Sequence, residues 1–414
     1  MKCGLLNRLG LLVAIGMTGY SQAQTVEFLH WWTSKGEQKA LHALSEELVT
    51  QGVELELKSV EGGGGEPALT VLQTRVLAGN VPEMALVEGV NIQSWAKLNL
   101  VYKLDNAASA DEWAEQHYSL VTKLNTVGDS YVAVPLNIHR MNWMWLNQPL
   151  FEKLGSQKPR DWNEFLQLMV KAKQLGIKPL ALGNDPWQVA QLFENIVLSI
   201  GGKQLYYDAL VKLDKAALQS DEISQALEIF RQISVLQPLP LEKISWSEAT
   251  EQLARGKALI QVGGDWILGE LMSFDRQQVD NVVCAAIPGT EQKFLYNMDS
   301  VIFLRSKYVN QASANMIASE LHADSAQLKF NRYKGSIPVK EALDISDYHA
   351  CQKTSKRDFE RAWKAGNTLP SMSDSMALDP HKQRIFNLEL YRYFIYHDRS
   401  IEGLVNKLLS LAVS

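Results

Sequence analysis

Apolar and polar positions follow two different periods along this chain, and their alternation predicts strands and helices in turn. A strand-like stretch at 26–32 breaks at the polar turn 33–36, after which the apolar positions recur with helical spacing. Residues 53–60 alternate apolar and polar side chains as a half-buried strand does. A helix after Pro67 and a buried strand at 82–89 follow. This order of strand and helix predicts a parallel α/β sheet with right-handed crossovers.

The second half of the chain repeats these patterns. Residues 149–235 are predicted to be mostly helical, 256–262 to form a strand, and 263–266 to turn into another helix. Pro135 interrupts an apolar run, which indicates a crossing between parts of the fold because proline is disfavoured in a central strand. An amphipathic helix is predicted over 385–410.

Residues 1–23 are expected to be a signal peptide. Lys2 and Arg8 flank the start of a short apolar region, and residues 21–23 supply the small side chains that a signal peptidase recognises. The apolar region is too short to span a membrane. Cleavage near Ala23 is expected to leave a soluble, exported protein.

Length, charge and cysteine content narrow the class of protein. About 390 residues would remain after cleavage, which is enough for two domains. A net charge of -5 and the lack of a basic tract argue against nucleic-acid and membrane-surface partners. Cys284 and Cys351 would be the two cysteines of the exported chain, and one disulfide is the simplest expectation, with two buried thiols as the alternative. No cofactor or metal site is predicted.

The turn after the first strand is the first candidate site. Trp31 and Trp32 precede the carboxylate of Glu37 there, at a place where ligands collect in open α/β sheets. A tryptophan ring suits the C–H face of a pyranose, and a carboxylate accepts hydrogen bonds from its hydroxyls. The alternative is that both tryptophans belong to the core.

Two further stretches bear on the chemistry of the site. The glycine run 62–65 before a helix lacks both phosphate-binding patterns and is predicted to be a close-approach loop at a cleft. Asp299 lies in a strand-like run, where a carboxylate needs a partner. His139 is interpreted as a hydrogen-bonded residue at a crossing, because no second metal ligand stands beside it at suitable spacing.

Eight segments, in the same order along nearly all of the exported chain, resemble the periplasmic sugar-binding proteins of ABC importers, and within them the glucose/mannose type. They are LHWWTSKGE, VEGGGGEPALTVLQTR, YVAVPLNIHRMNWMW, PLALGNDPWQ, GKALIQVGGDW, YNMDS, FNRYKGSIPV and LPSMSDSMA. The resemblance implies a two-lobed α/β clam-shell that holds sugar between its lobes and delivers it to a membrane permease. Each lobe would be a mainly parallel sheet flanked by helices and discontinuous in sequence.

The resemblance also implies where the lobes lie in the sequence. The N-terminal lobe is expected to comprise 24–136 and about 290–340, and the C-terminal lobe 137–289 and about 341–414. The crossings between them are expected near Asn137, 288–296 and 337–343.

The positions that match the sugar contacts of this family are Trp32, Glu37, Trp246, Trp266, Asp299 and Lys334, and Trp31 is added as the neighbour of Trp32. Tryptophan rings can stack on a sugar, carboxylates can accept from vicinal hydroxyls, and a lysine can donate. The alternatives are that Trp246 and Trp266 are core aromatics and that Lys334 pairs with a nearby carboxylate.

Three positions depart from the glucose-binding pattern. Leu86 stands where a glutamine is expected, Glu88 where a histidine or lysine is expected, and Asp374 where a histidine is expected. The pocket would then hold the carboxylates of Glu37, Glu88, Asp299 and Asp374 against one lysine, and crowded carboxylates repel one another unless a cation joins them. A glucose-like hexose is the expected ligand, with a cationic amino sugar or an oligosaccharide as the alternative.

A glycoside hydrolase also uses paired carboxylates in an aromatic cleft. The resemblance to binding proteins over nearly the full length, together with the lack of a recognisable hydrolase motif, predicts that the chain is not an enzyme. A sensor subunit that presents sugar to a chemoreceptor or kinase would use the same fold. The protein is expected to be a periplasmic monomer whose partners are a monosaccharide or small oligosaccharide and the transmembrane subunits of an ABC permease.

Overall fold

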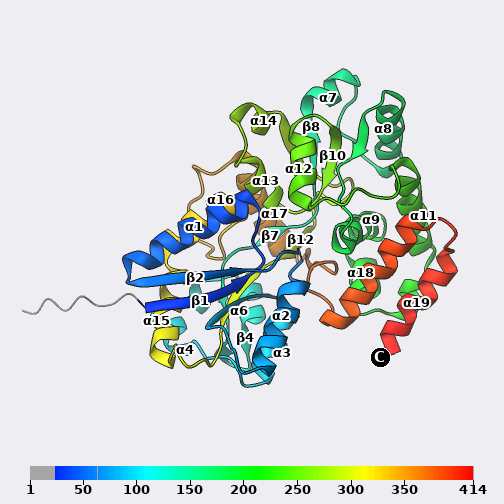
Figure 1. The fold of residues 1–414 in the computed structure, drawn as a ribbon. Helices are drawn as coiled ribbons and strands as arrows, with labels where there is room; N and C mark the ends of the chain where they lie inside the picture. The colour runs from blue at the N-terminus through cyan, green and yellow to red at the C-terminus, as the bar shows by residue number, and fades with distance from the viewer. Residues whose placement is uncertain (1–23, 63, 414) are drawn as a thin grey trace, which may run out of the picture.

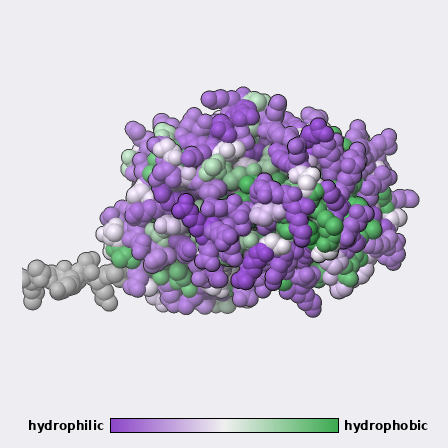
Figure 2. Space-filling model, turned by 90° about the horizontal axis from the view of Figure 1, so that it is seen from above, coloured by the Kyte–Doolittle hydropathy of each residue, from purple (hydrophilic) through white to green (hydrophobic). Residues whose placement is uncertain are grey.

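The computed structural model describes residues 24–62 and 64–413, which form two main sheets with helices packed against them (Figure 1). The predicted signal peptide, residues 1–23, lies outside the described residues. Within those residues, no helix has both the length and the apolar character that crossing a membrane requires. The face seen in Figure 2 is largely hydrophilic, with scattered apolar patches.

The first sheet has the strand order β2-β1-β3-β13-β6. β1 runs parallel to β2 and β3, whereas β13 runs antiparallel to β3 and β6. Its strands are β1 (Gln24–His30), β2 (Val53–Ser59), β3 (Met84–Glu88), β6 (Val134–Pro135) and β13 (Asp299–Phe303). The helices in this part of the chain are α1 (Lys35–Thr50), α2 (Glu66–Leu77), α3 (Val90–Lys97), α4 (Asp105–Ala110), α5 (Trp113–Gln116), α6 (Ser119–Asn125), α15 (Gln311–His322) and α16 (Asp324–Lys334).

The second sheet has the order β11-β8-β10-β9, and only β9 and β10 are parallel. Its strands are β8 (Trp143–Asn147), β9 (Lys178–Leu180), β10 (Ala258–Val262) and β11 (Val282–Ala286). The helices of this part are α7 (Gln148–Lys153), α8 (Trp162–Gln174), α9 (Pro186–Tyr206), the π-helix η1 (Tyr207–Val211), α10 (Lys215–Leu218), α11 (Asp221–Leu236), α12 (Trp246–Ala254), α13 (Trp266–Leu271), α14 (Arg276–Asp280), α18 (Pro380–Ile395) and α19 (Ile401–Val413).

The chain passes between the two main sheets at a small third sheet. This sheet has the order β14-β12-β7 and consists of β7 (His139–Arg140), β12 (Phe294–Asn297) and β14 (Thr368–Pro370). β6 and β7 are separated only by residues 136–138, and β12 and β13 only by Met298. A bridge between Ile138 and Ile337 lies beside them. The remaining elements are the short hairpin β4 (Thr126–Val127) and β5 (Ser130–Tyr131), and the helix α17 (Ala350–Lys364).

The predicted α/β fold is confirmed, with one correction to the sheets. Both main sheets are mixed rather than mainly parallel. In the first sheet β13 runs antiparallel to its neighbours β3 and β6, and in the second sheet β8 runs antiparallel to β10 and β11. The division into lobes at the sequence boundaries given above stays a prediction.

The single helix predicted over 385–410 is wrong. The structure has α18 and α19, because α18 ends at Ile395 and Tyr396 takes an extended backbone conformation. The hydroxyl of Ser400 then accepts from the backbone N–H of Gly403 and starts α19.

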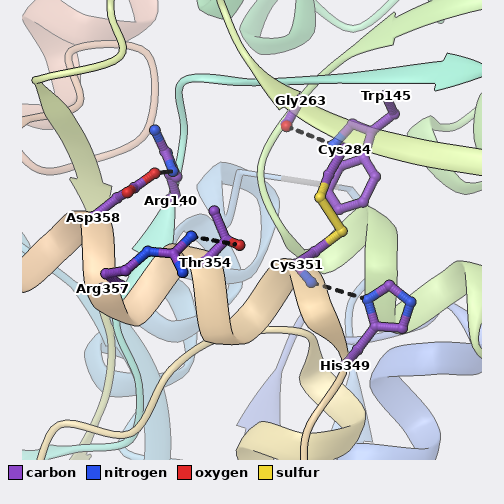
Figure 3. Close-up of a disulfide and its surroundings, with 9 residues drawn as sticks. All are labelled: Arg140, Trp145, Gly263, Cys284, His349, Cys351, Thr354, Arg357 and Asp358. Carbon is purple, nitrogen blue, oxygen red and sulfur yellow. Dashed lines mark hydrogen bonds and ion pairs between the residues drawn. A yellow bond between two sulfur atoms is a disulfide. The ribbon is translucent and has the colours of Figure 1, made fainter.

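The predicted disulfide is confirmed between Cys284 of β11 and Cys351 of α17. Two turns further along α17, the Asp358 carboxylate accepts from Arg140 Nη1 at 2.7 Å, and the Arg140 side chain is fully buried. Figure 3 shows both connections. Together they hold α17 to the second sheet and to the crossing strand β7.

Candidate functional site

A cavity with an empty volume of about 450 Å³, part of it open to solvent, lies where the first sheet, the second sheet and the crossing strands meet. Side chains reach it from loops at strand ends and from helix ends, which is where ligands bind in open α/β sheets. The lining residues are Trp31, Thr33, Glu37, Gly64, Glu88, His139, Trp187, Trp246, Trp266, Asn297, Asp299, Lys334 and Asp374.

All the residues predicted to contact sugar except Trp32 line this cavity. Trp32 is fully buried in the core of the first sheet, with ring centroids 5.2 Å from Phe330 and 6.1 Å from Phe28. The core alternative therefore describes Trp32, although Lys334 Nζ lies 5.2 Å from its ring centroid. Leu86 is also a core residue and not a lining one.

Five lining residues were not among the predicted sugar contacts: Thr33, Gly64, His139, Trp187 and Asn297. Asn297 lies two residues before Asp299 in the same strand-like run, and Trp187 follows Pro186 at the head of a helix. A signal was present in the sequence at both positions, since a polar residue in a strand needs a hydrogen-bond partner and a tryptophan at the start of a helix needs a surface to pack on.

The aromatic wall of the cavity comes mainly from the second-sheet side. The ring of Trp266 lies 5.9 Å from that of Trp187 and 6.4 Å from that of Trp246, each pair near edge-to-face. From the other side, the ring of Trp31 packs over Gly65, where a Cβ atom would lie 3.1 Å from it. Gly65 has φ +73°, so a larger residue would be both strained and in collision with Trp31.

Glu37 is held rigidly by the start of α1. Ser34 and Glu37 form a capping box, in which the Glu37 carboxylate accepts from the backbone N–H groups of Thr33 and Ser34, both at 3.1 Å. Its other oxygen accepts from Lys334 Nζ at 3.0 Å. Lys334 is the last residue of α16, which ends in a left-handed glycine, Gly335. The cavity thus holds a fixed acceptor beside a fixed donor.

Lys334 and Asp299 both stay charged. Burial lowers the pKa of Lys334, but Glu37 and Asp299 outweigh it and raise that pKa overall. Burial raises the pKa of Asp299, but Lys334 and His139 outweigh it and lower that pKa to about 2. Both side chains are therefore ionised at neutral pH. A hydrogen bond between a charged side chain and a ligand is stronger than one between neutral groups.

His139 is a cation between two carboxylates. Its Nδ1 contacts Asp265, and its Nε2 lies 3.2 Å from an Asp299 oxygen that also accepts from Asn137 at 2.7 Å. Burial lowers the pKa of His139, but Asp265 and Asp299 raise it to about 9 overall. Burial raises the pKa of Asp265, and the nearby His139 opposes this increase. We place the proton on His139, because its ring contacts the carboxylates of both Asp265 and Asp299. The expected hydrogen-bonded role of His139 at the crossing is confirmed.

Glu88 and Asp374 share one donor. The Asn297 amide Nδ2 donates to Glu88 Oε1 at 3.0 Å and to Asp374 Oδ2. Neither Glu88 Oε2 nor Asp374 Oδ1 accepts a hydrogen bond from a donor in the described part of the chain. Burial raises the pKa of Asp374 to about 7. Burial also raises the pKa of Glu88 well above its usual value, and the neighbouring carboxylates of Asp374 and Asp299 add to this increase.

The loop that carries Asp374 is fixed by Glu194 of α9. This buried carboxylate accepts from the hydroxyls of Ser371 and Ser373, both at 2.8 Å, and from the backbone N–H of Met372 at 2.7 Å. Tyr206 donates to it at 2.9 Å. Asp374 therefore enters the cavity from a rigid loop.

Among residues 24–62 and 64–413, no group of three or more His, Cys, Asp or Glu side chains is arranged to hold a metal ion.

Comparison with known proteins gives a consistent match. The family model of bacterial extracellular solute-binding proteins matches residues 31–281. The chain is 33% identical over 356 residues to a probable sugar-binding periplasmic protein of Brucella suis biovar 1 (strain 1330). The matched residues make up 86% of this chain and 84% of the relative. The chain is also 32% identical over 363 residues to a probable sugar-binding periplasmic protein of Rhizobium meliloti (strain 1021), covering 88% and 87%.

Solved structures match the fold over almost the whole chain. The bacterial solute receptor AcbH, described with a preference for β-D-galactopyranose, superimposes with a TM-score of 0.78 at 16% identity, covering 94% of this chain and 97% of the receptor. Maltose-bound MalE3 of T. maritima gives a TM-score of 0.76 at 16% identity, covering 94% and 99%. At these identities the matches show the shared fold.

Proposed function

We propose that this chain, which belongs to the family of bacterial extracellular solute-binding proteins, is the sugar-binding component of an ABC importer and holds a glucose-like hexose in the cavity around Glu37, Asp299 and Lys334. The observation that carries the proposal is the pairing of aromatic walls with fixed, ionised hydrogen-bonding groups in one cavity. A pyranose has the same two characters, with apolar C–H faces and a rim of hydroxyls.

Each group of lining residues has a role in this proposal. Trp246 and Trp266 stack on the sugar ring, Glu37 and Asp299 accept from hydroxyls, and Lys334 donates to an oxygen.

The family is one of binding proteins and not of enzymes, so the hydrolase alternative no longer stands. We further propose that the two lobes predicted above close on the sugar because it binds the closed form more tightly. In this proposal the chain is exported to the periplasm after cleavage near Ala23 and acts as a monomer that delivers sugar to the transmembrane permease.

Calorimetry of the purified protein with glucose, mannose and galactose tests the proposal. We expect saturable binding of at least one of these hexoses and a loss of about tenfold or more in its affinity in Asp299→Asn, because a charged hydrogen bond is removed. Glu61→Gln, which changes an exposed carboxylate outside the cavity, is the matched control and should leave the affinity unchanged. Absence of binding with any monosaccharide, or equal affinity of Asp299→Asn and the wild type, would contradict the proposal.

A further inference from the structure

Glu88 and Asp374 are the two carboxylates of the cavity that the hydrogen bonds described above leave incompletely paired. Each side chain is 4% exposed. One oxygen of each accepts from Asn297, and the other oxygen, Glu88 Oε2 or Asp374 Oδ1, accepts no hydrogen bond from the described residues. A buried carboxylate oxygen without a donor is costly. The site therefore favours a ligand that brings donors to these two atoms.

The protein's own cations in the cavity are engaged elsewhere. Lys334 forms its ion pair with Glu37, and His139 forms its ion pairs with Asp265 and Asp299. No ion pair between described residues includes Glu88 or Asp374. The Asn297 amide supplies hydrogen bonds but no positive charge. These two carboxyl groups thus have no cation among the described residues as a partner, and a ligand with a positive charge would favour their ionised form.

The strand register places a third carboxylate beside this pair. In the antiparallel pair β3–β13, Glu88 lies directly opposite Asp299. Like charges at directly opposite positions destabilise a sheet. Since Asp299 remains ionised, it raises the pKa of Glu88 in addition to the effect of burial.

The free oxygen of Asp374 lies beside Gly64 and the Trp187 ring. A Cβ atom at Gly64 would be 3.6 Å from Asp374 Oδ1 and 3.3 Å from Trp187, and Gly64 has φ +77°. Glycine at this position keeps side-chain atoms away from the carboxylate. The neighbouring indole ring is also a favourable surface for a cation.

We infer that Glu88, Asp374 and Asn297 form a subsite for an ammonium group, and that the hexose bound in this cavity carries an amino substituent. An ammonium group has three donors and a positive charge, which match two free carboxylate oxygens. A neutral hydroxyl brings one donor and no charge. The inference rests on the proposed function, because it takes the cavity to be a hexose site.

Calorimetry at pH 7 with glucosamine, glucose and N-acetylglucosamine tests this subsite. Glucosamine should bind at least about tenfold more tightly than glucose, and N-acetylglucosamine, in which the nitrogen is a neutral amide, should not share the gain. This comparison uses the wild-type protein and so does not depend on how a variant folds.

The variants Glu88→Gln and Asp374→Asn keep the shape of each side chain and remove its charge. In each, the ratio of glucosamine affinity to glucose affinity should fall at least about tenfold. Glu66→Gln, an exposed carboxylate on α2 that does not line the cavity, should leave the ratio unchanged. A melting curve for each variant checks that it is folded.

The outcomes separate this inference from the proposed function. Glucose binding as tightly as glucosamine, or a ratio unchanged in both variants, overturns the ammonium subsite and leaves the hexose site in place. Absence of binding with all three sugars and with mannose and galactose overturns both.

Discussion

Lys334 is 3% exposed, and Glu37 is its ion-pair partner in the structure. Removing one member of a buried ion pair leaves the other charge unpaired, whereas removing both is far less costly. At this position, the proposed sugar contacts and the stability of the protein depend on the same two side chains.

We therefore expect Lys334→Met to lower the free energy of unfolding by about 3–5 kcal/mol. The double variant Glu37→Gln/Lys334→Met should recover part of that loss, since no buried charge is left alone. Urea denaturation of the wild type, both single variants and the double variant measures this coupling. A double variant less stable than Lys334→Met would contradict the buried-pair interpretation.

Asp374 makes stability depend on pH. Its pKa rises from its ordinary value of 3.8 to about 7 in the folded protein, so the folded state binds the proton more tightly than the unfolded chain does. The stabilisation is fully present below about pH 4 and is lost as the pH rises through about 7. His139, with a pKa raised to about 9, adds a loss between about pH 6.5 and 9.

Asp374→Asn should remove the first of these two losses. Between pH 4 and pH 7, the free energy of unfolding of the variant should fall less steeply than that of the wild type. Denaturant titrations at a series of pH values measure both slopes. Parallel slopes would show that Asp374 does not titrate in this window.

At the residue scale, the sequence singles out residues that complete a motif or depart from one. Glu88 and Asp374 were found because they break a pattern, and both line the cavity. It could not separate Trp31 from Trp32, because neighbouring residues at a strand end differ only in the side to which each ring turns. Asn297 was missed because its role depends on Glu88 and Asp374, which are distant in sequence.

At the scale of elements, α17 is attached to the second sheet by a covalent bond at its start. The disulfide closes a loop between residues 67 positions apart. In the chain-entropy account, such a crosslink stabilises the folded state by restricting the unfolded chain.

The double variant Cys284→Ser/Cys351→Ser should lower the free energy of unfolding by about 2–4 kcal/mol. Hexose affinity should change little, because neither cysteine lines the cavity. Denaturation and calorimetry of the same samples provide the two readouts. A large loss of affinity with unchanged stability would mean that α17 positions the site.

Strands and helices with clear periodicity were predicted close to their observed places, and the main error concerned the final helix. The break between α18 and α19 is supported from α11, where Arg231 donates to the carbonyl groups of Tyr396 and Arg399. Ser234 of α11 also donates to the carbonyl of Phe394. The spacing of apolar residues carries no information about these contacts with α11. The helical pattern therefore predicts one continuous helix across the break.

At the scale of the whole molecule, the halves that carry the two sheets meet closely at glycines. A Cβ atom on Gly36 of α1 would lie 2.4 Å from the backbone of Gly269 in α13. One on Gly269 would lie 2.6 Å from the carbonyl oxygen of Lys334. Glu270 Oε2 accepts from the backbone N–H of Gly36 at 2.8 Å, so α13 also caps the start of α1.

Gly269→Ala should therefore disfavour this arrangement by about 1–3 kcal/mol, a typical cost of overpacking. We expect a weaker hexose affinity and a larger radius of gyration in solution scattering with saturating sugar. Gly403→Ala, in the exposed part of α19, is the control and should leave both unchanged. Wild-type affinity in Gly269→Ala would show that binding does not require this contact.

The order of strands in the first sheet has a consequence for the making of the protein. β13 joins β3 to β6, yet it is translated long after both, once the whole second sheet has been made. Until residues 299–303 emerge, β3 has an open edge and the first sheet is incomplete. The first sheet can therefore be completed only late in synthesis, after the strands of the second sheet have been made.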